Sequence, residues 1–319
     1  MNALDNNHNN SRTLDIVIPS YQRGAILLDT IDYLHKQTED YVSLIIVDQT
    51  VYSDGDETAE KLQSMSEQGV IQWVREEKPS IPNAMNIGLL TASSDLVLFL
   101  DDDIVPADNL ISMHIAAHSD QSIVASVGQI LQPNEHAKTV DVPESLESFD
   151  ADLNFPFYSN TKRYIQNCMA GNLAVNREAA IACGGFDTNF IGAAYRFETE
   201  FCRRLLRHSQ AHCLFSPEAT LQHLKIASGG TRSKAKNFLC SILPDHSVGE
   251  YYFVLREAKG FAKIYYLLRR YFGSLKARFY LLKPWWIPVR MIAEARGFYN
   301  ALLLLLNGPR YISPKVHVK

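Results

Sequence analysis

Three adjacent carboxylates follow an uncharged apolar segment near the first third of the chain. Residues 96 to 103 read Leu-Val-Leu-Phe-Leu-Asp-Asp-Asp. Asp101, Asp102 and Asp103 repel one another, and burying any of them without a counter-charge is costly. A hard divalent cation such as Mn²⁺ or Mg²⁺ makes the arrangement favourable, because these ions prefer carboxylate oxygens. The cluster therefore predicts a metal site; a solvated acidic loop is the alternative.

The elements around the acids support the first interpretation. Residues 96–100 read as a buried strand of a parallel sheet, since such strands are covered on both faces and lose polar alternation. In open α/β sheets, ligands bind beyond the carboxyl ends of the strands, where these acids fall. Apolar segments and helical spacings alternate along residues 14–100, which predicts a mostly parallel nucleotide-binding sheet flanked by helices. The expected strands are 14–19, 43–47, 70–74, 96–100, 123–131, 168–175 and 212–215, and the expected helices are 25–37, 58–68, 81–91, 178–183 and 199–208. Residues 132–165 are predicted to be a long surface loop.

Length and cysteine content limit the class of protein. A chain of 319 residues forms one large domain or two smaller ones. Its five cysteines form no Cys-x-x-Cys pair, so we expect reduced thiols and a cytoplasmic protein. Residues 1–13 are polar, rich in asparagine and unlike a signal peptide, so we expect them to be disordered. No stretch of about 18 uncharged apolar residues predicts a spanning helix.

Charge divides the chain into two parts. Residues 1–231 carry 31 acidic and 15 basic residues, whereas residues 232–319 carry 4 acidic and 16 basic ones. We therefore predict a catalytic domain over 14–232 and a basic, aromatic, mainly helical region over 233–319. Apolar residues recur at helical spacing from Leu255 to Leu282, and two prolines flank Trp285 and Trp286 soon after. Such a region suits an anionic membrane surface; packing on the catalytic domain or a homodimer interface is the alternative. Nucleic acid is not expected, because the catalytic part is acidic.

Seven short motifs in a fixed order carry a family resemblance. They read Val-Ile-Pro-Ser-Tyr-Gln-Arg at 17–23, Ile-Val-Asp at 46–48, Asn-Ala-Met-Asn-Ile-Gly at 83–88, Leu-Asp-Asp-Asp at 100–103, Gly-Asn at 171–172, Gly-Gly-Phe-Asp at 184–187 and Phe-Glu-Thr-Glu-Phe at 197–201. Together they resemble family 2 glycosyltransferases of the GT-A fold. The resemblance implies transfer of a sugar from a nucleotide diphosphate donor to an acceptor hydroxyl, with inversion.

The same resemblance implies a donor site. Asp101 and Asp103 match the family's Asp-x-Asp pair, with Asp103 contacting the metal and Asp101 serving the ribose or a metal-bound water. Asp48 takes the place of the carboxylate that holds the nucleobase, often uracil. The remaining donor-binding candidates line the ends of the first strands and helices and the acidic cluster: Pro19, Ser20, Tyr21, Arg23, Asn86 and Asp102.

An inverting transfer needs a general base at the acceptor hydroxyl. In the family this is a carboxylate that opens a helix, and Glu198 is the first candidate here, with Glu200 second. The chain departs from the family in having Glu198 where Asp is common and Phe197 where Glu often precedes it. The alternative is that both acids only stabilise the start of a helix through its dipole.

A histidine and an arginine complete the predicted site. His223 takes the position where some GT-A enzymes have a further metal or diphosphate ligand. The segment 228–232, Ser-Gly-Gly-Thr-Arg, reads as a loop that brings Arg232 over the phosphates.

These patterns together predict a metal-dependent inverting glycosyltransferase with Mn²⁺ or Mg²⁺ as cofactor. The favoured donor is a UDP-sugar, and the acceptor is a glycan or a lipid-linked sugar, as in polysaccharide biosynthesis. We expect a cytoplasmic protein, peripheral on the cytoplasmic membrane face. A catalytically inactive glycan-binding or scaffold protein and a nucleotidyltransferase are the alternatives.

Overall fold

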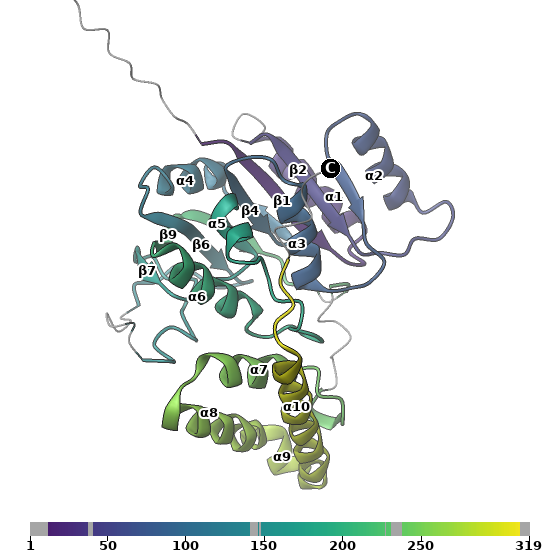
Figure 1. The fold of residues 1–319 in the computed structure, drawn as a ribbon. Coiled ribbons are helices and arrows are strands. Elements are labelled where there is room, and N and C mark those ends of the chain that lie inside the picture. Colours follow the sequence, from purple (N-terminus) through teal and green to yellow (C-terminus); the bar gives the residue numbers. More distant parts are fainter. Residues whose placement is uncertain are drawn as a thin grey trace, which may run out of the picture.

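The structure is a computed structural model that describes residues 12–37, 41–140, 146, 148–226, 228–230 and 238–312. Its first half alternates strands and helices as the sequence predicts (Figure 1). The elements in order are β1 (Leu14–Ser20), α1 (Ala25–His35), β2 (Ser43–Asp48), α2 (Glu57–Glu67), β3 (Gln72–Arg75), α3 (Ile81–Thr91) and β4 (Leu96–Leu100). Strands β3, β2, β1 and β4 lie side by side and are parallel.

The second half of the sheet is mixed. It contains β5 (Ile104–Pro106), α4 (Leu110–Ala117), β6 (Ile123–Leu131), β7 (Arg163–Ile165), β8 (Asn172–Asn176), α5 (Arg177–Ala182), α6 (Phe197–Ser209) and β9 (His212–His223). Among the described residues, nine strands form one sheet in the order β3-β2-β1-β4-β8-β6-β9-β5, with β7 beside β9. Strand β8 runs antiparallel to both β4 and β6. Residues that follow β4 and residues that precede β8 therefore meet at one edge of the sheet.

Helices cover both faces of the sheet. Apolar residues of α1, α2 and α4 form one core with the strands, and those of α3, α5, α6 and α7 (Val248–Glu257) form the other. All five side chains of β4 are fully buried, as predicted for a strand covered on both faces. Helix α3 lies close to β1 because Gly88 has no side chain; a Cβ there would approach Val17 to 2.2 Å.

The prediction of a surface loop over 132–165 is wrong for part of that segment. Phe155 is 6% exposed and packs edge-on against Phe215, with 4.8 Å between the ring centroids. Asp152 is also buried and accepts a hydrogen bond from the backbone N–H of Gln166. Residues 163–165 form β7, which pairs with β9. Its aromatic residues pack into the core, but they do not recur with a regular period, so the sequence pattern did not predict their burial.

The C-terminal region is helical, as predicted. After α7 follow α8 (Gly260–Gly273), α9 (Arg278–Leu282) and α10 (Ile287–Asn307), with short 3₁₀ turns η4 (Ser274–Lys276) and η5 (Pro284–Trp286) between them. The helical spacing from Leu255 to Leu282 does not form one helix. Ala258 adopts an extended backbone with ψ of 143° and Gly260 has φ of +53°, which separates α7 from α8. None of the helices in the described part of the chain is long and apolar enough to cross a membrane.

Helix α7 belongs to the core of the sheet rather than to a separate appendage. Its residues Tyr251 to Leu255 are buried against the same cluster as α6. Buried charges reinforce this contact: Arg256 of α7 pairs with Asp187 at 2.5 Å and with Glu200 of α6 at 3.3 Å. The predicted domain boundary at residue 232 lies in a part of the chain, 231–237, that the structure does not describe.

Candidate active site

The acids after β4 differ in their surroundings. Asp101 keeps 51% of its side chain exposed, whereas Asp102 and Asp103 are buried. Gly171, just before β8, makes room for Asp101, because a Cβ there would lie 2.3 Å from its Oδ2. Asp101 therefore presents a carboxylate to solvent at the carboxyl end of β4, where the open-sheet rule places a ligand.

Asp103 and His223 face each other across the strand ends. His223 Nε2 lies 3.1 Å from Asp103 Oδ1 and 3.9 Å from Asp101 Oδ2, and His223 Nδ1 lies 3.1 Å from Oε1 of Gln132. Burial raises the pKa of Asp103, but the hydrogen bond from His223 and the charge of Arg23 outweigh it and lower the pKa. Burial likewise lowers the pKa of His223, but the two aspartates outweigh it and raise the pKa. Gln132 accepts a hydrogen bond from Nδ1–H and so directs Nε2 to the acids.

Arg23 forms hydrogen bonds with several other residues near the site. Its Nε donates to Asp102 at 2.8 Å, and its Nη1 donates to the carbonyls of Ile226 and Ser228 at 3.1 and 2.7 Å. Burial raises the pKa of Asp102 to about 7, although Arg23 and Ser20 oppose this effect. Arg23 thus joins the acidic cluster to the segment 226–230, which carries the glycines predicted to form a loop over the site.

One cavity of about 650 Å³ joins most of the predicted residues. Its lining includes Pro19, Ser20, Tyr21, Arg23, Asp101, Asp102, Asp103, Glu198 and His223. These residues come from the ends of β1, β4 and β9 and from the start of α6. The fold therefore brings together side chains that lie up to about 200 positions apart in the sequence.

Glu198 stands in the first turn of α6 and lines this cavity. Its Oε1 accepts a hydrogen bond from the backbone N–H of Ala170 at 3.4 Å. The helix N-terminus favours the ionised carboxylate, which suits a proton acceptor. Ala194 and Arg196 just before it have φ of +52° and +68°. Non-glycine residues rarely adopt this conformation, and such strain clusters at functional sites.

Three predicted residues lie outside the cavity. Glu200 is fully buried and forms two hydrogen bonds of 2.9 Å with Arg204. Asn86 is buried and hydrogen-bonds the backbone N–H and carbonyl of Phe186. Asp48 is buried and accepts hydrogen bonds from Thr50 N–H and from the Trp73 indole. Each of these side chains holds neighbouring elements together. Arg232 lies outside the described residues.

Several lining residues were missed by the sequence reading. Gln49, Gln132, Asn167, Met169, Tyr195 and Glu250 also line the cavity. Gln49 directly follows the predicted base-binding Asp48, so its position at a strand end was a usable signal. Gln132 and Glu250 carried no such signal, because they reach the site only through the pairing of β6 with β9 and through the packing of α7.

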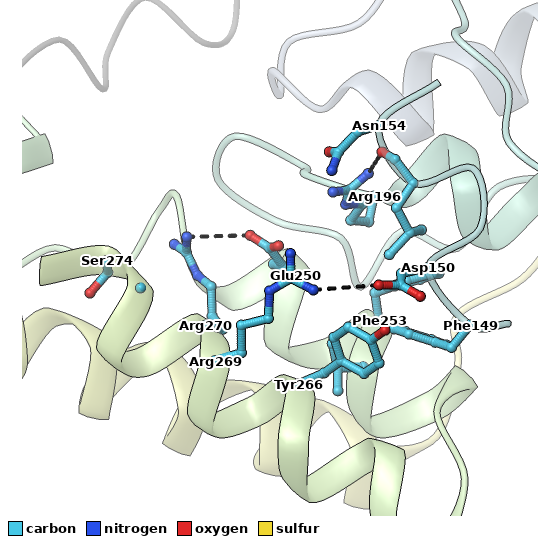
Figure 2. Close-up of a pocket in the computed structure, with 13 residues that line it drawn as sticks. Phe149, Asp150, Asn154, Arg196, Glu250, Phe253, Tyr266, Arg269, Arg270 and Ser274 are labelled. Carbon is cyan, nitrogen blue, oxygen red and sulfur yellow. Dashed lines mark hydrogen bonds and ion pairs between the residues drawn. The ribbon is translucent and has the colours of Figure 1, made fainter. Parts of the chain in front are cut away.

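A smaller cavity of about 250 Å³ adjoins the first (Figure 2). Leu153, Arg196 and Glu250 line both cavities. Figure 2 shows an aromatic wall with Tyr266 and Phe253, and charged side chains paired across the cavity. Arg269 pairs with Asp150, and Arg270 pairs with Glu250, each at 3.4 Å. Aromatic faces beside paired polar groups are well suited to a polyhydroxylated ligand, which has apolar C–H faces and many hydroxyl groups.

The donor atoms near Asp101 fit a divalent metal ion. Two carboxylates and one imidazole nitrogen suit Mn²⁺, which accepts oxygen and nitrogen ligands. Nε2 of His223 lies within 4 Å of a carboxylate oxygen of Asp101 and of Asp103, and Gln132 supplies the outer hydrogen bond typical of a ligating histidine. In the described part of the chain no three such groups already converge in a metal-binding geometry.

Two solved structures share this fold. A mannosyltransferase of Pyrobaculum calidifontis, PcManGT, in complex with GDP-Man and Mn²⁺, is 15% identical, with a TM-score of 0.54 over 94% of this chain and 80% of that one. GalNAc-T7 with UDP, GalNAc and Mn²⁺ is 16% identical, with a TM-score of 0.54 over 86% of this chain and 56% of that one. At these identities the likeness is one of fold, and it confirms the predicted GT-A architecture with its helical C-terminal region.

Sequence comparison identifies the family. "Glycosyltransferase GlyG" of Streptococcus pneumoniae serotype 4 (strain ATCC BAA-334 / TIGR4) is 21% identical over 169 residues. The match spans 53% of this chain and about half, 51%, of the length of that relative. A model of the family described as "Glycosyl transferase family 2" matches residues 15–184, more than half of the chain, and includes β1 to β8 and the acids after β4. The chain therefore belongs to glycosyl transferase family 2, as its seven motifs predict.

Proposed function

We propose that this protein transfers a sugar from a nucleotide diphosphate donor to a glycan or lipid-linked acceptor, with inversion at the sugar. One observation carries the proposal. A single cavity is lined by Asp101, Asp103 and His223, which lie close together, and by Glu198. This arrangement supplies charge stabilisation for a leaving diphosphate and a proton acceptor for an incoming hydroxyl.

The donor half of the proposal rests on the strand ends. The diphosphate gains negative charge as the glycosidic bond breaks, and a divalent ion held by Asp101, Asp103 and His223 would stabilise that charge. Both structural neighbours were solved with Mn²⁺ and a nucleotide or nucleotide sugar, which supports a divalent ion. The turn of Pro19, Ser20 and Tyr21 would enclose the nucleoside. A UDP-sugar remains the favoured donor, with Asp48 setting the turn at the end of β2 rather than lining the cavity.

The acceptor half rests on Glu198. Its carboxylate would take the proton of the acceptor hydroxyl as the hydroxyl attacks the sugar carbon from the face opposite the diphosphate. Glu200 is less suitable, because both of its oxygens accept hydrogen bonds from Arg204 inside the fold. The second cavity, which shares Arg196 with the first, would hold the acceptor's sugar ring beside the hydroxyl that reacts.

Arg23, Asp102 and Asn86 act indirectly in this proposal. Arg23 and Asp102 would hold the acids and the segment around Ile226 and Ser228 in place, and Asn86 would fix α3 to the turn after α5. Arg232 keeps its proposed role over the phosphates. A cytoplasmic location, peripheral to the membrane, and a role in polysaccharide biosynthesis are part of the same proposal.

A binding screen tests the donor half. UDP, GDP and dTDP are titrated into the protein by calorimetry, with and without Mn²⁺, and hydrolysis of the corresponding sugar donors is then followed. We expect Mn²⁺-dependent binding of UDP, weakened at least roughly tenfold in Asp101→Asn, because a metal ligand is lost. Asp108→Asn, an exposed acid nearby, serves as the matched control. If no nucleotide diphosphate binds the wild type with any metal, the proposal is wrong.

A further inference from the structure

Helix α8 has an apolar face that nothing covers in the described chain. None of its residues is buried. Phe261, Tyr265, Leu268 and Phe272 recur at spacings of three and four, and they are 87, 56, 52 and 57% exposed. This spacing puts them on one side of the helix. An amphipathic helix of a globular protein normally turns this side to the core, whereas α8 turns it outwards.

The following elements extend the same apolar character. Leu281 and Leu282 at the end of α9 are 82 and 72% exposed, and Trp285 in η5 is 66% exposed. Helix α10 buries one side against α7, and its other side also exposes large apolar side chains, namely Ile292, Tyr299, Leu303 and Leu306. Figure 1 shows α8, α9 and α10 forming the end of the molecule farthest from α2. We call these exposed side chains the outer helical surface.

The charge around the outer helical surface has one sign. From Ala258 to Ile312 the chain has ten basic residues and a single acidic one, Glu294. Glu294 is fully buried and pairs with Arg270 and Arg290, so none of the described residues in this segment exposes a carboxylate. Exposed basic residues lie close to the apolar side chains in sequence, among them Lys259, Lys276, Arg278, Lys283 and Arg296.

We propose that the outer helical surface docks on an anionic lipid bilayer. A bilayer interface accepts apolar and aromatic side chains below the headgroups and attracts lysine and arginine at their level. A second copy of the chain would cover the apolar side chains but would set two purely basic surfaces against each other. Nucleic acid would neutralise the bases but would leave Phe261, Leu281 and Leu306 in water. An anionic lipid surface satisfies both parts of the pattern, whereas a second copy and nucleic acid each satisfy one.

Docking in this way would bring the active site to the bilayer. The side of α8 that does not carry the apolar stripe lines the second cavity with Tyr266, Arg269 and Arg270. One helix, about 10 Å thick, then separates the proposed acceptor cavity from the lipid. This step rests on the proposed function and favours a lipid-linked acceptor, whereas the docking itself depends only on the helical region.

Vesicle co-sedimentation tests the docking without any nucleotide sugar, so its outcome is independent of catalysis. We expect the full-length protein to sediment with vesicles of phosphatidylcholine and phosphatidylglycerol in equal parts, and to remain soluble with phosphatidylcholine alone. Molar salt should release it, because the screening length falls to about 3 Å. Lys276→Glu with Arg278→Glu should weaken binding roughly tenfold or more, since each basic residue contributes on the order of 1 kcal/mol.

Matched variants separate specific docking from general effects. Lys61→Glu with Lys78→Glu makes the same charge change at exposed positions near β3 and should leave binding unchanged. Phe261→Ser with Leu282→Ser should weaken binding, whereas Val42→Ser with Val51→Ser, also at exposed positions, should not. Absence of wild-type binding to the anionic vesicles overturns the proposal. So does a lipid-free dimer in sedimentation velocity that the Phe261 and Leu282 variant dissociates, because a second copy would then cover the surface.

Discussion

At the residue scale, the two glutamates at the start of α6 are chemically alike but differ in environment. Glu198 lines the cavity, and Glu200 is buried with Arg204 and Arg256. Glu198 and Glu200 stand two positions apart in α6, about 200° around the helix at 3.6 residues per turn, so their side chains point to different sides. The two positions therefore make a matched pair for mutation.

We expect Glu198→Gln to lower sugar transfer by about 10²- to 10⁴-fold, which is the usual contribution of a positioned base. Affinity for the nucleotide diphosphate and thermal stability should hold, because the amide keeps the shape of the side chain. Glu200→Gln should instead lower stability by up to about 3–5 kcal/mol, since it leaves buried arginine charge uncompensated. Transfer rates and urea unfolding of both variants check this. Near-normal turnover in Glu198→Gln would show that another group accepts the proton.

At the scale of elements, a buried histidine joins α4 to the strands beneath the site. His114 lies 2.8 Å from Ser126 of β6 and 2.8 Å from Asn172 of β8. Asn172 in turn donates to the carbonyls of Gln129 and Ala219, where the pairing of β6 and β9 shifts register. Asn172 directly follows Gly171, the residue that makes room for Asp101. This hydrogen-bond network therefore fixes β6, β8 and β9 relative to one another next to Gly171 and Asp101.

Protonation of His114 should weaken this junction. Burial lowers its pKa to about 4 from the ordinary 6.5, so the unfolded chain binds the proton more readily than the fold does. The stabilisation is complete above pH 6.5 and is lost as the pH falls from 6.5 to about 4. The loss amounts to about 3 kcal/mol at 1.36 kcal/mol per pKa unit. Urea unfolding from about pH 7.5 to about pH 4 measures this loss.

The pH dependence should become shallower in His114→Gln and stay unchanged in His136→Gln, which alters an exposed histidine. It should not vanish, because burial also lowers the pKa of His118, to about 3. An equally steep loss in His114→Gln would assign the acid sensitivity to other groups.

At the scale of the whole molecule, buried ion pairs unite the family-2 domain with the C-terminal helices. Arg256 of α7 contacts Asp187 after α5 and Glu200 of α6, both fully buried. The hydroxyl of Tyr252 donates to the same Asp187 at 2.9 Å. The helical region is thus part of the wall behind Glu198 and not only a candidate membrane contact.

We expect Arg256→Met to destabilise the protein by about 3–5 kcal/mol, because it removes the arginine that pairs with the buried Asp187, whereas Glu200 keeps Arg204. Arg269→Met removes an ion pair whose partners are 54 and 41% exposed, and it should cost about 0–1 kcal/mol. Urea unfolding compares the two. Equal effects would mean that the contact between α6 and α7 depends on apolar packing alone.

The family, the alternation of strands and helices, and the position of the acids after β4 could all be predicted from the amino-acid sequence. These features are local: an apolar strand, a period of 3.6 and a carboxylate cluster are each readable within about ten residues. The basic character of the C-terminal region was readable for the same reason.

Which of the predicted polar residues face the cavity could not be predicted from the sequence, because it depends on tertiary packing. Glu198 and Glu200, or Asp101 and Asp103, are two positions apart in sequence, and their exposure depends on what packs against each side chain. Arg256 of α7 reaches Glu200, and Gly171 makes room for Asp101, through contacts between distant segments. The outward face of α8 was hidden for the same reason: helical spacing reveals an apolar stripe, but the direction of that stripe follows from which neighbours bury the opposite side.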